Sequence, residues 1–317
     1  MAALVVAGLA WGGSVPLSKV GLDWLAPGWL TAARFGLAAV VLLVAVPRPA
    51  LRAAFTGRVL ASGAFGYGGC VLLQNAGIAR TSVTHAALLI GAVPVLVAII
   101  AALWQHAVAR PVAWVGFALS LAGVAAVTGG HAAGATRAGD ALVLASALLS
   151  AAVTVAQGRL LANRDPVAVT AVQFTGAALV ALPFAVTTEG MPAVPSGGGA
   201  VLAVIALTAI GTLLPFTMFA YGQRRVSAEV AGAFLNLEPL VGAVAGIVAF
   251  GDPAGPRQLA GGAAIVAGIA LSSLPLLRGH RRQRGAQMPR WGSRSAIRSS
   301  TSGSPGSPVM AGTAASS

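Results

Sequence analysis

Charged side chains are scarce in this chain. Asp, Glu, Lys and Arg make up 9% of its 317 residues, whereas a soluble domain needs roughly a quarter of its residues charged to cover its surface. Hydrophobic residues reach 57%, and the mean hydropathy is +0.85. The shortage of charge argues against a water-soluble domain and predicts a membrane protein.

Other absences narrow the function. The single cysteine, Cys70, excludes an internal disulfide. The sequence has no phosphate-binding glycine loop, no HExxH metal motif and no GxSxG nucleophile elbow. Its arginines form short clusters between apolar runs, without interleaved aromatic residues, so we predict no nucleic-acid surface. We also predict no enzyme activity, no cofactor and no bound metal.

Apolar runs of about 20 residues, long enough to cross the roughly 30 Å hydrocarbon layer as helices, follow one another along the chain. Pro or Gly marks most of the short connections between them. We predict an all-α polytopic membrane protein with ten transmembrane helices. The predicted spans are residues 2–19, 28–46, 58–78, 82–104, 111–129, 139–160, 166–186, 199–221, 227–250 and 257–277.

The two halves of the chain repeat one another. At a separation of 145 positions, Pro94, Pro111, Gly116 and Gly123 recur as Pro239, Pro256, Gly261 and Gly268. At a separation of 139 positions, Pro27, Thr31, Ala32 and Phe35 recur as Pro166, Thr170, Ala171 and Phe174. This pattern predicts two five-helix repeats, at residues 1–130 and 138–277. The basic segment 278–317 that follows is predicted to be a disordered cytoplasmic tail.

Positive charge predicts the orientation of the spans. Eight arginines lie in the junctions after even-numbered spans and three in the junctions after odd-numbered spans, and the tail adds seven to the first group. Both termini are therefore predicted on the cytoplasmic side of the inner (plasma) membrane. Because five spans are an odd number, the second repeat must lie in the opposite orientation to the first. The prediction is a pair of inverted-topology repeats.

Several motifs, in order along the chain, resemble the EamA family of the drug/metabolite transporter superfamily. They are Trp11-Gly12-Gly13 with Lys19, Pro27 and Ala33-Arg34-Phe35; Ser82-Val83-Thr84-His85-Ala86-Ala87-Leu88 with Pro94; and Ser227-Ala228-Glu229 with Leu237-Glu238-Pro239. Gly251-Asp252 stands where the family has Gly-Glu, whereas Trp104-Gln105-His106 departs from that pattern after the fourth span. The resemblance covers about residues 5–275. It implies two inverted repeats of five helices that move small metabolites, often by exporting amino acids or related compounds.

Glu238 is the main candidate for substrate binding and for proton coupling. It lies near the middle of the ninth span, where a polar side chain is costly and functional by default. Removal from water disfavours the charged carboxylate, which favours proton binding near neutral pH. The next residue, Pro239, has no backbone N–H, so the carbonyl of Leu235 is predicted to be a free acceptor. A structural hydrogen bond to another helix is the alternative role for Glu238.

Three further residues are candidates for substrate binding near mid-membrane. Arg34 would meet a substrate carboxylate or an acidic partner, although its side chain could also snorkel outward. Trp11 and Tyr67 fall away from the interfacial belts where aromatic residues collect. Trp11 could stack on a substrate cation. Core packing is an equally weighted alternative for both aromatic residues.

Two amides and one histidine complete the candidates. Gln173 aligns with Arg34 in the repeat, so one half has a fixed charge where the other has a neutral amide. Asn236 is two residues from Glu238, about 200° around a helix, so it is weighed mainly as an interhelical hydrogen bonder. His85, near the start of the fourth span, is predicted to make a helix-end hydrogen bond.

The leading functional prediction is a secondary transporter that exports a small metabolite or drug by alternating access between the two halves. Proton antiport through Glu238 is the predicted coupling, and an uncoupled facilitator is the rival. A receptor, a lipid scramblase or an assembly factor that does not transport is a less favoured class. The predicted partners are a small-molecule substrate and the lipid bilayer. A homodimer and the identity of the substrate stay open.

Overall fold

The computed structural model describes residues 1–105, 111–128, 136–195, 197–226, 228–235, 237–252, 255–268 and 270–271. These residues form helices and their connections, without a strand among them. Six helical stretches are long and apolar enough to cross a membrane, so the chain is a multi-pass membrane protein. The predicted tail, 278–317, lies outside the described residues, as does Asn236.

The helices follow the predicted spans closely, and several spans are built from more than one element. The first half contains α1 (Ala2–Gly12), α2 (Ser14–Leu22), α3 (Pro27–Ala45), α4 (Arg48–Ala54), α5 (Gly57–Ala61), η1 (Ser62–Gly69), α6 (Cys70–Ile78), α7 (Val83–Ile90), α8 (Val93–Gln105) and α9 (Pro111–Thr128). The second half contains α10 (Arg137–Leu160), α11 (Pro166–Thr188), α12 (Gly198–Thr208), η2 (Ala209–Leu213), α13 (Leu214–Gln223), α14 (Ala228–Phe234) and α15 (Leu237–Phe250), and residues 256–268 are also helical.

Interruptions of these helices fall at matching places in the two halves. The π-helical turns η1 and η2 interrupt the predicted third and eighth spans. The predicted fourth and ninth spans break between α7 and α8 and between α14 and α15, just before Pro94 and Pro239. A proline without an N–H cannot continue the α-helical hydrogen bonding, which accounts for breaks at these two positions. The first span also breaks, at Gly13 between α1 and α2.

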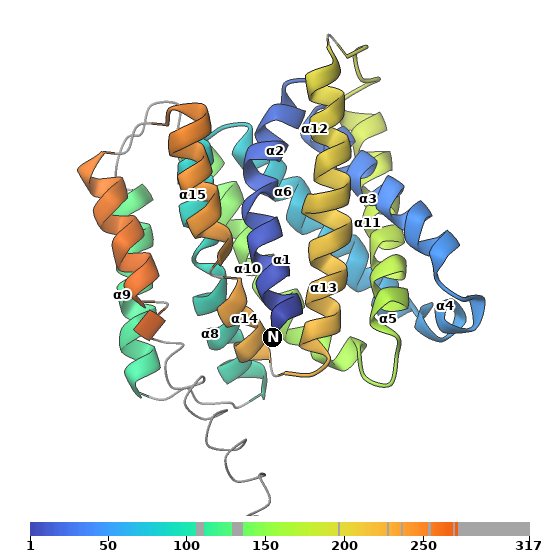
Figure 1. Cartoon of the computed structure of the whole chain (residues 1–317), viewed down its shortest axis with the longest axis horizontal. Coiled ribbons are helices and arrows are strands. Elements are labelled where there is room, and N and C mark those ends of the chain that lie inside the picture. The colour runs from blue at the N-terminus through green and yellow to red at the C-terminus, as the bar shows by residue number, and fades with distance from the viewer. Residues whose placement is uncertain are drawn as a thin grey trace, which may run out of the picture. The chain divides into compact units, whose positions relative to one another are not determined.

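Helices from the two halves pack against each other in antiparallel pairs (Figure 1). The start of α3 meets the end of α11, where the Glu189 carboxylate accepts hydrogen bonds from the backbone N–H groups of Gly28 and Trp29 at 2.8 and 3.1 Å. The start of α7 meets the end of α15, where Asp252 accepts a hydrogen bond from the N–H of Thr84 at 2.7 Å. Each carboxylate therefore caps a helix that belongs to the other half.

The remaining helices complete the same pattern. α1 lies along α13, and α6 lies along α10. α9 lies along residues 256–268 so closely that a Cβ on Gly123 would meet the backbone of Gly261, and one on Gly268 would meet that of Gly116. Small residues allow this close approach of helices in membranes. α8 also contacts α14, so each helix pair has a counterpart when the two halves are exchanged.

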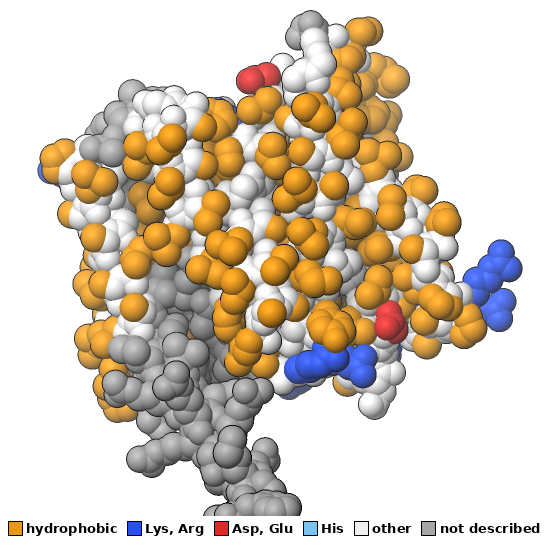
Figure 2. Space-filling model, viewed as in Figure 1, with side chains coloured by type: hydrophobic (Ala, Val, Ile, Leu, Met, Phe, Trp, Pro, Cys, Tyr) orange, Lys and Arg blue, Asp and Glu red, His pale blue; other side chains and the backbone are white. Residues whose placement is uncertain are grey.

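The outer surface is apolar. Figure 2 shows hydrophobic side chains over the face drawn, with Lys and Arg near its lower end and right edge. Val44 of α3 is 83% exposed and Val248 of α15 is 80% exposed. Such exposure of large apolar side chains is expected where helices face lipid instead of water.

Candidate substrate site

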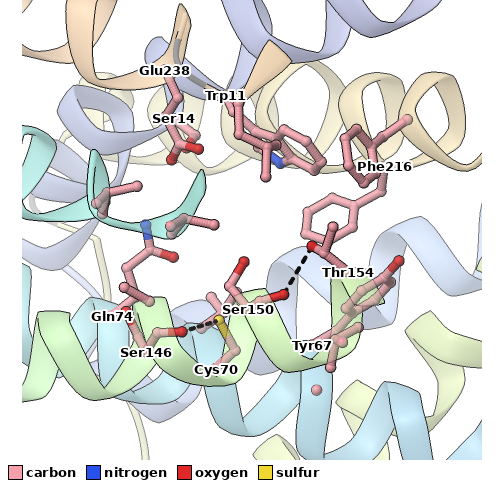
Figure 3. Close-up of a pocket in the computed structure, with 18 of the residues that line it drawn as sticks. Trp11, Ser14, Tyr67, Cys70, Gln74, Ser146, Ser150, Thr154, Phe216 and Glu238 are labelled. Atoms are coloured by element: carbon pink, nitrogen blue, oxygen red, sulfur yellow. Dashed lines mark hydrogen bonds between the residues drawn. The ribbon is translucent and has the colours of Figure 1, made fainter. Parts of the chain in front are cut away.

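A cavity lies between the two halves, and the residues that line it belong chiefly to α1, α2, α3, η1, α6, α7, α8, α10, α13 and α15 (Figure 3). Its volume is about 70 Å³, below the roughly 300–1,000 Å³ typical of small-molecule sites. Figure 3 shows Glu238, Ser14 and Trp11 on one side, with Ser146 and Ser150 of α10 opposite them. The cavity is therefore polar in part and narrow.

Arg34 supplies the positive charge of this cavity. Its side chain is 3% exposed, so it does not snorkel outward. Nε donates to Thr212 Oγ1 at 2.8 Å, and Nη2 donates to the backbone carbonyl of Gly211 at 2.9 Å. In an α-helix the N–H of residue 215 would bond that carbonyl, but residue 215 is proline. These bonds use two of the five guanidinium donors, which leaves three for a ligand.

Glu238 supplies the negative charge. It is 8% exposed, on the first turn of α15 where the helix resumes after its break. Among the described residues, no side chain donates a hydrogen bond to its carboxylate and no direct ion pair joins it to Arg34. The prediction that the Leu235 carbonyl would be free is wrong, because the N–H of Glu238 itself donates to it at 3.1 Å. The cavity thus holds two opposite charges that are not joined to each other.

Aromatic rings form one wall of the cavity. Trp11 packs edge-on against Phe216 and Phe219, with centroid distances of 5.0 and 5.1 Å. Tyr67 packs edge-on against Phe216 at 4.6 Å. All four side chains line the cavity. The wall offers an apolar surface beside the charged pair.

A row of polar residues on α10 forms the opposite side, and our sequence predictions missed most of it. Ser146, Ser150, Thr154 and Gln157 line the cavity. They follow one another at intervals of four, four and three residues, which places them on one face of the helix. That spacing of polar residues within an apolar run was a signal for the site. A serine or threonine is weakly polar, however, and in a membrane helix it also bonds its own backbone, as Thr154 does to the carbonyl of Ser150 at 2.9 Å.

Gln173 lies behind the cavity wall. Gln157 donates to the Tyr67 hydroxyl at 3.1 Å, and Gln157 and Gln173 exchange hydrogen bonds of 3.1 and 2.7 Å. Gln173 also donates to Ser62 Oγ at 3.0 Å. The structure therefore brings Trp11, Arg34, Tyr67 and Glu238 together at the cavity, while Gln173 does not line it and Asn236 lies outside the described residues.

A second buried polar cluster joins α7 to α10, away from the cavity. His85 Nδ1 lies 3.2 Å from Asp140 Oδ1, and both residues are buried. The Thr81 hydroxyl lies 3.2 Å from the same histidine nitrogen and 3.4 Å from Asp140 Oδ1. The histidine therefore does more than the predicted helix-end bond, because it pairs with an acid of the other half. Within the described ranges, no three His, Cys, Asp or Glu side chains are grouped to hold a metal ion.

Comparison with known proteins adds independent evidence. The model of the EamA-like transporter family matches residues 1–129 and again residues 137–274. A protein of Streptantibioticus cattleyicolor described as a probable terminal-alkyne amino-acid exporter is 31% identical over 293 residues, which cover 89% of this chain and 95% of that protein. A protein of Archaeoglobus fulgidus described as an uncharacterized transporter is 35% identical over 74 residues, 23% of this chain and 27% of that protein.

The fold is also similar to a solved one. A crystal structure superposes with a TM-score of 0.69 at 22% sequence identity, and the match covers 87% of this chain and 96% of the other. At this sequence identity, the comparison shows that the two folds are similar and carries no information about function.

Proposed function

The chain belongs to the EamA-like transporter family and is a membrane transporter, and from this premise we propose that it exports amino acids or closely related metabolites. The observation that carries the proposal is the pair of unjoined opposite charges, Arg34 and Glu238, at one cavity. An amino acid is a zwitterion. Its carboxylate would take the free donors of Arg34, and its ammonium group would approach Glu238.

The aromatic wall supports a substrate with an apolar side chain. Trp11, Tyr67 and Phe216 face the cavity beside the charged pair, and such surfaces bind apolar groups through burial and ring contacts. The relative from Streptantibioticus cattleyicolor is described as a probable terminal-alkyne amino-acid exporter, and a terminal alkyne is an apolar group. We propose the same substrate class, amino acids with a small apolar side chain, for this chain.

Alternating access between two inverted five-helix repeats is the mechanism we propose. The family model matches the chain twice, and the helix pairs between the halves are antiparallel, as inverted copies require. The cavity of about 70 Å³ is smaller than typical small-molecule sites, which supports a closed state that opens by movement of one half against the other. In this proposal the arginine-rich junctions and both termini face the cytoplasm, and the first repeat spans residues 1–130 and the second 138–277.

Proton antiport through Glu238 is the coupling we propose. The carboxylate has no side-chain partner among the described residues, so it is available to bind either a proton or the substrate ammonium group. Competition between these two ligands at one carboxylate would link export to proton entry. An uncoupled facilitator is the second candidate, because the same cavity would bind the substrate in either mechanism.

The test is transport by the purified protein in proteoliposomes. The assay measures uptake of a panel of amino acids, including one with a terminal alkyne, with and without a pH gradient. We expect gradient-driven accumulation by the wild type, loss of the gradient dependence in Glu238→Gln, and no change in Asp23→Asn, an exposed acid outside the cavity. Equal uptake with and without the gradient would favour the facilitator. Failure of every amino acid to move, with no effect of Glu238→Gln, would refute the proposed site.

A further inference from the structure

A second pocket, of about 540 Å³, opens at the end of α10 opposite its start at Arg137. Its polar lining consists of Arg58, Arg159 and Arg164 with Thr56 and Ser62, and Trp104 forms an apolar side. No residue of this pocket lines the central cavity. The pocket therefore collects three positive charges and two hydroxyl groups outside the site described above.

Among the described residues, no acidic side chain forms an ion pair with the arginines of this pocket. Arg58 and Arg159 are exposed. Arg164 is held in place, because it donates to the carbonyls of Ala53 at 3.3 Å and Leu160 at 3.0 Å. The neighbouring acid, Asp165, is occupied as the cap of α11, where its carboxylate accepts from the N–H of Ala168 at 2.9 Å.

A chain of side-chain hydrogen bonds connects this pocket to the central cavity. Ser62 lines the pocket, and Gln157 and Tyr67 line the cavity. Gln173 donates to Ser62 at 3.0 Å, Gln173 and Gln157 bond each other at 3.1 and 2.7 Å, and Gln157 donates to Tyr67 at 3.1 Å. Two amides, Gln173 and Gln157, thus link a residue of the pocket to a residue of the cavity. A line of polar groups in an apolar interior offers hydrogen-bonding partners to a charged group at each position along it.

We infer that the Arg58–Arg159–Arg164 pocket binds an oxyanion, a carboxylate or a phosphate group, at the inner mouth of the path to the central cavity. Arginine is the side chain best suited to both groups, because its planar fork donates two parallel hydrogen bonds. Three arginines in one recess, without an acidic partner in the described part of the chain, also concentrate anions there. The binding of the oxyanion rests on the pocket alone, whereas its place on a transport path rests on the proposed function.

Thiol modification tests the pocket without any transport assay. In a Cys70→Ala background, which removes the single native cysteine, Ala156→Cys introduces a thiol into the pocket lining. The assay compares its modification rates with an anionic and a cationic methanethiosulfonate in neutral-lipid nanodiscs. We expect the ratio of the anionic to the cationic rate to be about tenfold higher at this cysteine than at a free thiol in solution. Salt should lower this ratio.

A matched pair of variants makes the test specific. Combined replacement of Arg58, Arg159 and Arg164 by Gln should abolish the anion preference. Combined replacement of Arg48, Arg52 and Arg224 by Gln removes the same charge from exposed arginines outside the pocket, and it should leave the preference intact. An equal effect of both triple variants, or no anion preference in the parent, would overturn the proposal. Neither result would bear on the transport assay with Glu238→Gln.

Protection from modification identifies the source of the oxyanion. Slower modification of Ala156→Cys by millimolar inorganic phosphate or acetate in neutral-lipid nanodiscs would support a soluble ligand. Slower modification only when the nanodiscs contain phosphatidylglycerol would support a lipid headgroup, which is also an oxyanion. Absence of protection by all three would overturn the binding site.

The link to the cavity has its own reporter in Cys70, which lines the cavity. With the native cysteine in place, Gln173→Ala is expected to raise the modification rate of Cys70 by the anionic reagent severalfold. Gln223→Ala, which removes a buried amide from another part of the cavity lining, should not do so. An unchanged rate in Gln173→Ala, or an equal rise in both variants, would refute the link while leaving the oxyanion site standing.

Discussion

Arg34 and Glu238 are held at the cavity by two different local arrangements. Arg34 is anchored by Thr212 and the Gly211 carbonyl of a π-helical turn, so its guanidinium has a fixed direction. Glu238 stands at the resumption of a broken helix and has no side-chain donor among the described residues. The arginine is thus a preorganised anchor, whereas the carboxylate is free to change partner. In the proposed function, the fixed arginine would bind the substrate carboxylate, and the free glutamate would bind either a proton or the substrate ammonium group.

At the residue scale, the His85–Asp140 pair is predicted to fasten α7 to α10. Asp140→Asn should leave His85 with a poorer partner in a buried position. We expect a loss of about 1–3 kcal/mol, the usual cost of weakening a buried polar contact. Thermal unfolding of the detergent-solubilised protein measures this loss, with Asp23→Asn as an exposed control. Equal melting temperatures for Asp140→Asn and the wild type would contradict the role.

At the element scale, close contact between α1 and α15 positions Glu238. A Cβ on Gly12 would fall onto the side chain of Val241 and within 3.0 Å of the Glu238 carbonyl. We therefore expect Gly12→Ala to push α15 aside and to lower the transport rate about tenfold or more. Gly36→Ala in α3 meets nothing within 4 Å and should transport like the wild type. Equal initial rates for the two variants in proteoliposomes would show that this contact does not matter.

The cap that Asp252 provides to α7 is a second feature at this scale. Its carboxylate lies 2.7 Å from the N–H of Thr84, at the positive end of the helix dipole. Asp252→Ala is expected to destabilise the protein by about 1 kcal/mol. Asp252→Glu should recover most of this loss, since it keeps the charge and can reach the same N–H. Chemical or thermal unfolding measures both, and a failure of the glutamate variant to exceed the alanine variant would argue against a capping role.

Elements were predicted well where one helix forms one span, and less well where the backbone departs from an α-helix. Periodic apolar runs and flanking Pro or Gly identify α3, α10 and α11 to within a few residues. The π-helical turns η1 and η2 were missed, because they depend on packing against α11 and α3, which no local pattern records. The short helix α4 was read as a connection, although prolines such as Pro47 and Pro49 favour a helix start there.

The site shows the same limit. Arg34 and Glu238 are conspicuous in apolar runs, so a sequence with few charges identifies them. Phe216 and Phe219 are not conspicuous, since an aromatic residue in a membrane helix can equally pack against lipid. Gln173 was predicted to line the cavity by analogy with Arg34 in the repeat. It is shorter than arginine and bonds Ser62 and Gln157 behind the wall instead.

At the scale of the whole molecule, the proposed inverted repeat makes a prediction about which side of the membrane each half exposes. Gly57 and Gly198 are the first residues of α5 and α12, at corresponding places in the two halves, and a Cβ at either meets nothing within 4 Å. In a Cys70→Ala background, we expect Gly198→Cys to react with an impermeant maleimide in intact cells. Gly57→Cys should react only after the membrane is permeabilised. Reaction of both from the same side would mean that the two halves are not inverted.

The measurement that tests the Arg34–Glu238 site most directly is a thermodynamic cycle between protein and ligand. Equilibrium exchange in proteoliposomes gives the half-saturating concentrations of an amino acid and of the amine that lacks its carboxylate, for the wild type and for Arg34→Gln. We predict that Arg34→Gln weakens the amino acid at least tenfold, about 1.4 kcal/mol, and leaves the amine almost unchanged. Equal weakening of both ligands, or of neither, would contradict the pairing of Arg34 with the substrate carboxylate.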